Sequence, residues 1–569
     1  MKYSELCGIY EALGKTTKRL EKIFILSHFL KKLSLEDRDV VYLFLGTIYP
    51  AYSEKETGIS NQTVIKAIAK VSGQSEEHVV KEWKKIGDLG EVAEGLMKDK
   101  KQSSLFSSTL TTKKVIAELR AVAEFEGKGT VGKKIDLIAG LFASAKPVEA
   151  KYLVRTMLAD LRIGIQESTI REALASAFFS DGENLEMKKN ASAKIQNAYN
   201  LNPDIAFVFE SAKKGMKEIE KISLNTGKPV KAMLAQKVSS IAEGFEVVGK
   251  PCIFEYKYDG FRIIASKGSD GKVALFTRRL DNVSKQFPDV VESITKFVSG
   301  KSFIIDSEVV GYNPKTKKYL PFQAISQRIK RKYEIEKMVK EFPVEVNVFD
   351  ILMHNGESLI NKPFLERTKL IRKIVKQNKY KIICAKQLIT DDEKKAKMFF
   401  DEALKNNQEG LMIKNLKGIY KPGSRVGYMV KLKPEHRELD LVIVGAEYGT
   451  GKRAGWMSSF VLACRDEDEG KFLEIGKVGT GIKEKTELGV SFLELTNLLK
   501  PLIIETKGKG VKLKPKIVVT VIYQEIQKSP TYSSGYALRF PRVTALRVDK
   551  PVSEINTLDE IKREYGGQK

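Results

Sequence analysis

The stretch Glu255-Tyr256-Lys257-Tyr258-Asp259-Gly260-Phe261-Arg262 decides how the middle of the chain is interpreted. Asp-Gly between two alternating runs is a strong signal for a two-residue hairpin turn, so we expect Lys257 on a strand just before a tight turn. Because side chains alternate between the two faces of a strand, Glu255 and Lys257 should share one face. Taken alone, this pair would be an ordinary ion pair on an exposed hairpin.

Three downstream segments repeat this pattern of charge on strands. Asp306-Ser307-Glu308 is expected to end a strand with two carboxylates on one face, Glu409-Gly410 leads into another strand, and Lys431-Leu432-Lys433 puts two lysines on one face of a third. Four charged strand ends indicate a single polar cleft. A magnesium-bound triphosphate needs such a cleft, with cations for the phosphates, carboxylates for the metal and a nucleophile in line.

The 569 residues predict three or four domains at about 100–200 residues each. Apolar residues recur at helical spacing up to residue 221, which predicts an all-α domain over 1–221. Strand-like and helical runs then mix over 222–435, which predicts an α+β domain. Short strands dominate over 436–569, which is typical of a small β-barrel.

The charge balance indicates a polyanionic partner. Lysine and arginine number 98 against 72 acids, a formal net charge of +26, and nucleic acid is the default partner for such an excess. The alternative is lysine spread over the surface for solubility. In KYLVRTMLADLRIGI, Arg155 and Arg162 lie seven apart, so we predict that they share an outward helical stripe that contacts DNA phosphate. An ordinary solvated face is the competing interpretation.

Several classes of protein are excluded by what the sequence lacks. The four cysteines are too few and too dispersed for a disulfide framework or a paired CxxC zinc site, so we expect a reducing interior. No signal-peptide core and no apolar run of membrane-spanning length are present, so secretion and membrane insertion are not expected. The GTGKRAG stretch at 449–455 departs from a phosphate loop, since Arg453 stands where Ser or Thr should hold magnesium, and we interpret it as a hairpin loop.

At Lys257-Tyr258-Asp259-Gly260 the chain resembles the KxDG signature of covalent nucleotidyltransferases. The later segments TRRLDNVSKQFPD, FIIDSEVVGY, PFQAISQR, VFDILMHNGESL, EGLMIK, PGSRVGYMVKLK and EIQKSPTYSSGYALRFPRVTALRVDK follow in the order of that superfamily's motifs. Together they resemble an ATP-dependent DNA ligase of the archaeal and eukaryotic replicative type, over nearly the whole chain. The resemblance implies a helical DNA-binding domain, an adenylation domain and a C-terminal OB-fold.

The resemblance implies roles for individual residues. Lys257 would attack the α-phosphate of ATP and become an adenylated lysine, with Glu255 near the nucleoside and Phe349 stacked on adenine. Glu308 and Glu409 would bind Mg²⁺, with Mn²⁺ as a substitute, because hard divalent ions prefer carboxylate oxygens. The remaining residues expected to bind ATP or AMP are Arg262, Arg278, Glu308, Lys414, Arg425, Lys431, Lys433, Arg547 and Lys550.

Two positions depart from the family's usual pattern. Ser307 replaces a glycine in Asp-Gly-Glu, and Tyr428 stands where a tryptophan often precedes the final lysine pair. Neither touches the nucleophile, so we expect altered detail with activity kept.

The implied cycle has three steps: adenylation of Lys257, transfer of AMP to the 5′-phosphate at a nick, and sealing by the 3′-hydroxyl, in DNA replication, repair and recombination. Nicked duplex DNA is the expected partner, held through its backbone. An mRNA-capping guanylyltransferase or RNA ligase is an alternative with the same lysine chemistry, and a non-catalytic nucleic-acid scaffold is an alternative of another class. An NAD-dependent ligase is disfavoured, because the dispersed cysteines cannot form that family's zinc module.

Lys101-Gln102-Ser103-Ser104-Leu105-Phe106 resembles the short motif with which such ligases bind a sliding clamp, through Gln102, Leu105 and Phe106. An ordinary surface loop is the alternative. We expect an intracellular monomer, cytoplasmic and archaeal.

Overall fold

The computed structural model describes residues 1–55, 57–98, 109–125, 129–180, 185–320, 322–329, 331, 333–406, 408–433, 438–449, 453, 455–484, 489–523 and 525–566. The chain forms two compact units, the first made of residues 1–225 and 229–231 and the second of residues 226–228 and 232–569. The chain therefore crosses into the second unit at residue 226, returns to the first unit for residues 229–231, and stays in the second unit from residue 232 onward. Within the described residues, no helix is both long and apolar enough to cross a membrane.

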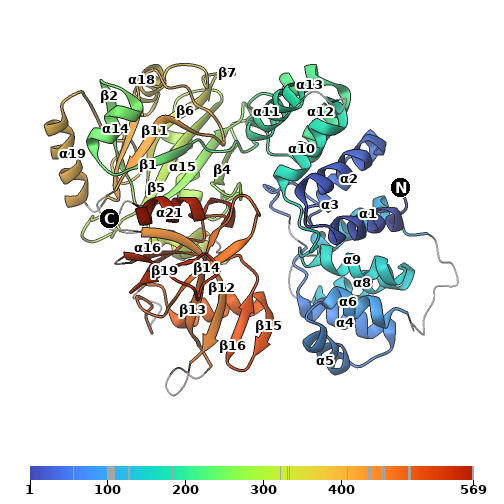
Figure 1. The fold of residues 1–569 in the computed structure, drawn as a ribbon. Helices are drawn as coiled ribbons and strands as arrows, with labels where there is room; N and C mark the ends of the chain where they lie inside the picture. The colour runs from blue at the N-terminus through green and yellow to red at the C-terminus, as the bar shows by residue number, and fades with distance from the viewer. Residues whose placement is uncertain are drawn as a thin grey trace. The chain divides into compact units, whose positions relative to one another are not determined.

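The first unit is helical in its described residues, which confirms the prediction for this part of the chain (Figure 1). Helix ends follow local sequence signals: Ser60 caps the first turn of α4, and Gly73 ends that helix in the left-handed conformation. Its helices are α1 (Tyr3–Lys15), α2 (Arg19–Lys32), η1 (Leu35–Asp37), α3 (Val40–Leu43), α4 (Asn61–Ser72), α5 (Glu76–Ile86), α6 (Leu89–Leu96), α7 (Thr112–Glu124), α8 (Val131–Ser144), α9 (Pro147–Met157), α10 (Glu167–Phe178), α11 (Leu185–Leu201), α12 (Ile205–Lys214) and α13 (Met216–Glu220).

The outward stripe predicted for Arg155 and Arg162 is wrong. Helix α9 ends at Met157, and the chain turns through Ala159 in the left-handed region, so the two arginines do not share a helix. Arg155 is buried, and its guanidinium donates to Asp88 from two nitrogens, at 3.1 and 2.6 Å. Arg162 reaches the same carboxylate at 3.2 Å. Both side chains are therefore engaged within the unit.

Two sheets form the first half of the second unit, as the predicted α+β composition requires. Among the described residues, the five-stranded sheet has the order β1 (Leu234–Val238), β11 (Arg425–Leu432), β10 (Gly410–Asn415), β2 (Cys252–Lys257) and β9 (Gln387–Thr390). The six-stranded sheet has the order β4 (Val273–Thr277), β3 (Phe261–Lys267), β5 (Phe303–Gly311), β6 (Val344–His354) and β7 (Glu357–Ser358), with β8 (Ile382–Cys384) beside β6.

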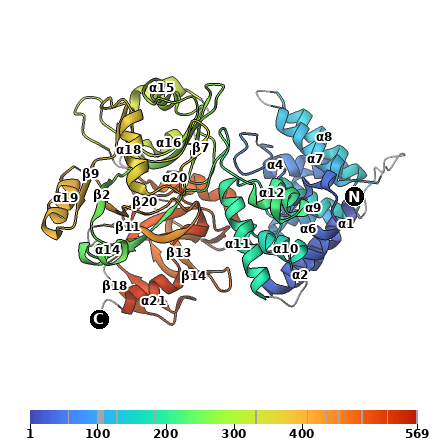
Figure 2. The ribbon, with the colours of Figure 1, turned by 90° about the horizontal axis from the view of Figure 1, so that it is seen from above.

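Helices cover the outer faces of these sheets. Helices α14 (Ile241–Val248) and α19 (Glu393–Lys405) pack on the five-stranded sheet (Figures 1 and 2). Helices α15 (Pro288–Phe297) and α18 (Phe364–Ile374) pack on the six-stranded sheet, near α16 (Gln323–Ile329) and α17 (Ile335–Glu341). Phe254 and Tyr256 of β2 face the apolar core under α14 and α19, so the predicted alternation along β2 is confirmed.

The predicted hairpin at Asp259-Gly260 is wrong. Strand β2 belongs to the five-stranded sheet and β3 to the six-stranded sheet, so the turn carries the chain from one sheet to the other. Gly260 is required here, because a Cβ atom at this position would overlap the carbonyl oxygen of Val309. Asp306 and Glu308 also lie within β5 and not at its end. The local turn signal was correct, but it does not specify which strands pair.

The C-terminal part of the second unit is rich in strands, as predicted. Its described strands form a seven-stranded sheet of β12 (Glu438–Tyr448), β13 (Met457–Arg465), β14 (Phe472–Val478), β15 (Ile503–Lys507), β16 (Gly510–Leu513), β17 (Val518–Ile522) and β20 (Arg542–Leu546), and a separate pair of β18 (Glu525–Lys528) and β19 (Tyr536–Arg539). Strand β12 bridges the sheet, since it pairs with β13, β16 and β17. The helices are α20 (Phe492–Leu499), η4 (Lys500–Leu502), η5 (Val552–Glu554) and α21 (Leu558–Gly566).

Candidate active site

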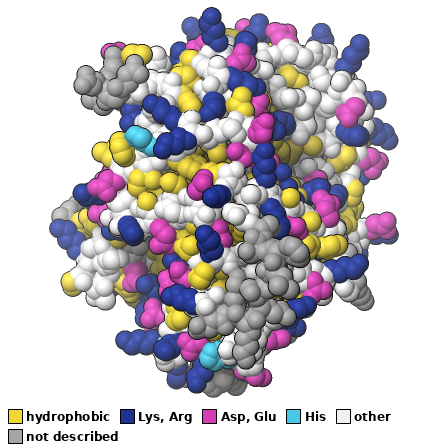
Figure 3. Space-filling model, turned by 90° about the vertical axis from the view of Figure 1, so that its right-hand side faces the viewer, with side chains coloured by type: hydrophobic (Ala, Val, Ile, Leu, Met, Phe, Trp, Pro, Cys, Tyr) yellow, Lys and Arg dark blue, Asp and Glu magenta, His cyan; other side chains and the backbone are white. Residues whose placement is uncertain are grey.

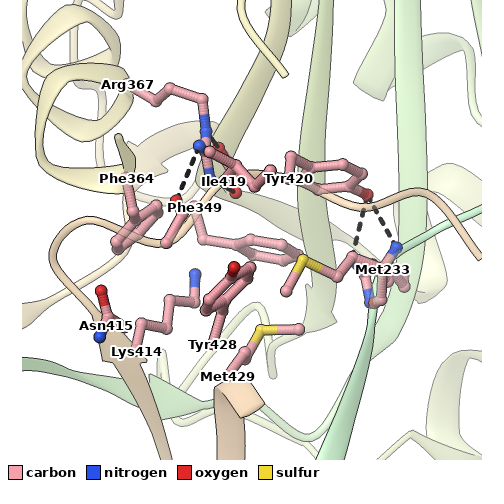
Figure 4. A pocket seen from close by; sticks show the side chains of 13 residues that line it. Met233, Phe349, Phe364, Arg367, Lys414, Asn415, Ile419, Tyr420, Tyr428 and Met429 are labelled. Carbon is pink, nitrogen blue, oxygen red and sulfur yellow. Dashed lines mark hydrogen bonds and ion pairs between the residues drawn. The ribbon is translucent and has the colours of Figure 1, made fainter. Parts of the chain in front are cut away.

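A pocket lies between the two sheets, on the faces turned away from α14, α15 and α19, and α18 closes one side of it (Figure 4). Strands β3 and β6 contribute to one wall, β10 and β11 contribute to the other, and α18 contributes Phe364 and Arg367. The lining combines aromatic rings with a few polar groups, as in sites for flat organic ligands. The residues that line it are Met233, Arg262, Phe349, Asp350, Phe364, Arg367, Lys414, Asn415, Gly418, Ile419, Tyr420, Tyr428 and Met429.

Lys414 and Glu255 form a buried ion pair beside this pocket. The Lys414 ammonium lies 2.5 Å from Glu255 Oε2, and the side chains of both residues are almost inaccessible to solvent. The same ammonium lies 4.7 Å from the ring centre of Phe349 and 4.3 Å from that of Phe364. Lys414 therefore connects a fixed carboxylate to two aromatic rings of the pocket wall (Figure 4).

Arg262 closes the opposite side through a network of hydrogen bonds. It donates to both oxygens of Asp306, at 2.8 and 2.5 Å, and to the carbonyl oxygen of Met233 at 2.7 Å. Tyr420 donates its hydroxyl to Asp306 at 2.7 Å and accepts from the amide of Met233. Because these partners use most of its donors, Arg262 shapes the pocket wall, and its guanidinium lies 5.3 Å from the ring centre of Phe349.

Lys257 lies at the end of β2, where several carboxylates and cations converge. Its ammonium pairs with Glu409, which also lies 3.2 Å from the ammonium of Lys433. Burial raises the pKa of Glu409, but the charges of Lys257 and Lys433 outweigh burial and hold it well below the usual carboxyl range. Burial raises the pKa of Glu308 to about 8, against the opposing effect of Lys257 and Arg262.

The backbone at this point depends on a glycine opposite the lysine. Gly410 is the register partner of Lys257, and the amide of Glu409 donates to the Lys257 carbonyl oxygen at 2.8 Å. Gly410 has a φ of +142°, and a Cβ atom there would overlap the carbonyl oxygen of Leu432. Glu409-Gly410 therefore brings its carboxylate to Lys257 because β10 can approach β11 closely.

The RVDK segment adds cations to this cluster. Arg547 donates to Asp549 at 3.0 Å, and Lys550 pairs with Asp440, which lies 3.9 Å from Arg547. The positive charge of Arg547 lowers the pKa of Glu409, so Arg547 lies near the carboxylate that pairs with Lys257. Burial and then the charge of Lys550 hold the pKa of Lys431 well below the usual lysine range.

Some predicted residues lie away from this cluster. Arg425 stands at the opposite end of β11 from Lys431, about 20 Å along the strand, and faces Glu560 of α21 at 3.7 Å. Arg278 belongs to the charged region, since its positive charge acts on Lys431, but its guanidinium is paired with Glu554. Gln102, Leu105 and Phe106 lie outside the described residues.

Sequence reasoning missed several residues of the site. Tyr420, Met233 and Arg367 have no motif that marks them, and their positions depend on long-range packing. Asp549 could have been predicted from the sequence, because it lies within RVDK between Arg547 and Lys550, which were predicted. Asp440 had no signal beyond being a charged residue in an apolar strand.

Comparisons with known proteins identify the family of this chain. Residues 2–175 match the family described as DNA ligase N terminus, residues 232–433 match ATP dependent DNA ligase domain, and residues 453–550 match ATP dependent DNA ligase C terminal region. The chain belongs to the family of ATP-dependent DNA ligases. It is 45% identical to a DNA ligase of Nanoarchaeum equitans, over 100% of this chain and 99% of that protein, and 40% identical to one of Thermococcus fumicolans, with the same coverage.

Proposed function

We propose that Lys257 is the residue that carries AMP during ligation. The observation that carries this proposal is the position of its amine at the end of β2, where it pairs with Glu409, which Lys433 also contacts. Two residues earlier on the same strand, Glu255 pairs with the pocket residue Lys414. The neutral amine attacks the α-phosphorus of ATP, an N–P bond forms, the bond to the bridging oxygen breaks, and pyrophosphate leaves. The amine loses its proton in this step.

The pocket supplies binding and orientation for this reaction. The nucleoside lies against Phe349, with Glu255 and Lys414 at the edge of the base and Arg262 as a fixed wall. Lys433, Arg547 and Arg278 offer positive charge to the phosphates, since phosphoryl transfer depends mainly on positioning and charge stabilisation. Burial lowers the pKa of Lys431 and of Lys550, and a phosphate beside them would favour their charged forms. Arg425 lies about 20 Å along β11 from Lys431, so we do not assign it to the phosphates.

We assign Glu308 and Glu409 to a divalent cation, Mg²⁺ or Mn²⁺. The described residues hold no cluster of three or more metal-binding side chains. Two carboxylates close enough to influence each other fit Mg²⁺, which commonly takes one or two carboxylates and completes its shell with phosphate oxygens and water. When bound, the cation neutralises charge on the phosphates.

The later steps use the same centre. An oxygen of the 5′-phosphate at a nick attacks the phosphorus of the lysine adenylate and breaks its N–P bond. The 3′-hydroxyl then attacks the 5′-phosphorus and AMP leaves. Contacts to the DNA backbone suit this substrate, because a nick has no sequence, and basic side chains are spread over the face shown in Figure 3.

Other parts of the proposal rest on the family and on strand order. We infer that the C-terminal domain is an OB-fold barrel, supported by the central position of β12 between β13, β16 and β17. The domain limits proposed from sequence, 1–221, 222–435 and 436–569, are kept. The archaeal organisms of its relatives support an archaeal source, and we propose a monomeric, cytoplasmic enzyme with a sliding clamp as a partner.

Labelling with radioactive nucleotides tests the proposal. Purified protein and Mg²⁺ are mixed with α-labelled ATP, with α-labelled GTP or with labelled NAD, then denatured and examined for covalent label. We expect label from ATP alone, lost in Lys257→Ala and kept in Lys267→Ala, a matched lysine at the end of β3. Absence of label in folded protein that mass spectrometry shows to be unadenylated would refute the assignment, and label from GTP would favour a capping enzyme.

A further inference from the structure

Gln387 lies directly opposite Glu255 across two paired strands. It is the first residue of β9, and its register partner on β2 is Glu255. Residues paired in this way in an antiparallel ladder face the same side of the sheet, with Cβ atoms about 5 Å apart. Gln387 therefore reaches the carboxylate that borders the pocket, although it does not line the pocket itself.

All the hydrogen-bonding groups of the Gln387 amide have partners. The Nε2 atom donates to Glu255 Oε1 at 2.5 Å and to the Thr368 hydroxyl at 2.8 Å. The Oε1 atom accepts from Arg372 Nε at 3.2 Å. A flipped amide would place oxygen against the carboxylate and nitrogen against the guanidinium, so these contacts fix its orientation.

The two residues that hydrogen-bond to the Gln387 amide besides Glu255 come from α18, the helix that also forms part of the pocket wall. Thr368 and Arg372 are four residues apart on α18, and Phe364, one turn earlier on the same helix, lines the pocket. With Gln387 on one oxygen and Lys414 on the other, the Glu255 carboxylate is held at both ends. Glu255 is 1% exposed, so no bulk water replaces a lost partner.

We propose that Gln387 is a positioning residue for base selection: it holds Glu255 so that this carboxylate accepts a hydrogen bond from the exocyclic amino group of adenine. The proposal rests on the nucleoside position given under Proposed function. A fixed carboxylate accepts from the 6-amino group of ATP and gains nothing from a purine without that group. The preference for ATP then depends on the fixed orientation of the Glu255 carboxylate and not only on its charge.

The test compares ATP with purine riboside 5′-triphosphate, which lacks the amino group. Self-adenylation of the full chain is measured over a range of each nucleotide, to give a half-saturating concentration and a maximal rate. For Gln387→Met, which keeps length and loses the amide, we expect the half-saturating ATP concentration to rise roughly tenfold, the scale of one hydrogen bond to a charged group. The value for purine riboside triphosphate should change less than about twofold on the same basis, since it has no such bond to lose.

Two further variants complete the design. Arg372→Met removes the hydrogen bond that the exposed Arg372 side chain donates to Gln387 Oε1. It should raise the half-saturating ATP concentration by a smaller factor than Gln387→Met does. This variant tests the proposal if Gln387→Met does not fold. Lys373→Met makes the same charge change on the next residue, also exposed, and should shift neither value.

The outcomes separate this inference from the proposal beneath it. Equal losses for both nucleotides, or an unchanged preference for ATP, would show that Gln387 only supports the fold and would overturn the inference. A wild-type chain that labels Lys257 equally well from both nucleotides would also overturn it, and would leave Lys257 as the nucleophile. Absence of any label at Lys257 would instead refute the proposed function.

Discussion

Replacing Arg155 by methionine tests whether this residue supports the helical unit or contacts DNA. Methionine keeps an unbranched apolar stem and removes the guanidinium that pairs with Asp88 at 2.6 Å. Both partners are buried, and removing one partner of a buried ion pair costs about 3–5 kcal/mol, since the other charge loses its compensation. Arg162 stays 3.2 Å from Asp88, which favours the lower end of that range.

Hydrogen exchange of the full chain measures this cost locally. Asp88 accepts from the amides of Gly90 and Glu91 and so caps the start of α6. A loss of about 3 kcal/mol corresponds to roughly a hundredfold faster exchange, because each 1.4 kcal/mol is a factor of ten. We expect this acceleration in peptides from α6 and α9. Peptides from the second unit serve as the internal reference.

The affinity for nicked DNA, measured over a series of salt concentrations, tests whether Arg155 contacts DNA instead. A residue that contacts phosphate contributes about 0.9 to the slope of log affinity against log salt concentration. The structure predicts that Arg155→Met leaves this slope unchanged. A slope reduced by about one unit, with exchange in α6 as in the wild type, would refute the structural role and restore the DNA contact predicted from the sequence.

Three other outcomes are expected. Burial raises the pKa of Asp88, but hydrogen bonds and charge from Arg155 leave it below the usual value of about 4. The ionised carboxylate therefore stabilises the folded unit above pH 4, and this contribution is lost as the pH falls further. We expect faster hydrogen exchange in α6 at pH 3 than at pH 5, after correction for intrinsic rates. Gly410→Ala should abolish self-adenylation and lower the melting temperature, because its Cβ would meet the Leu432 carbonyl; normal labelling would contradict this. Phe349→Ala should raise the half-saturating ATP concentration about tenfold or more while Phe349→Tyr does not, since a buried aromatic contact is lost; equal effects would argue against stacking.

Local regularities in the sequence predicted the elements of the site well. The period of two along β2 correctly put Glu255 and Lys257 on one face, since it depends only on strand geometry. The pairing of strands could not be read in the same way. Asp259-Gly260 carries the signal of a hairpin, but its two strands join different sheets, and that choice is made by packing far along the chain.

Long-range partners explain the remaining differences. Arg155 was predicted to be outward-facing because the carboxylate that buries it lies 67 residues away and has no motif. Gln387 was not identified for the same reason, since its importance follows from facing Glu255, 132 residues earlier. Residues in a continuous motif, such as Lys257, could be found directly, whereas residues that hold them in place required the fold.

The crossing from β2 to β3 has a mechanical consequence for the pocket. Two short links join the two sheets: residues 258–260 between β2 and β3, directly after Lys257, and residues 385–386 between β8 and β9. The carbonyl oxygen of Lys257 also accepts from the Glu409 amide on the neighbouring strand. If the sheets separate to admit a nucleotide, these two links hold the five-stranded sheet at β2 and β9, which are adjacent, so the separation is largest toward β10 and β11. The Lys257 amine then keeps its position while the pocket widens at Tyr428 and Asn415, on β11 and β10.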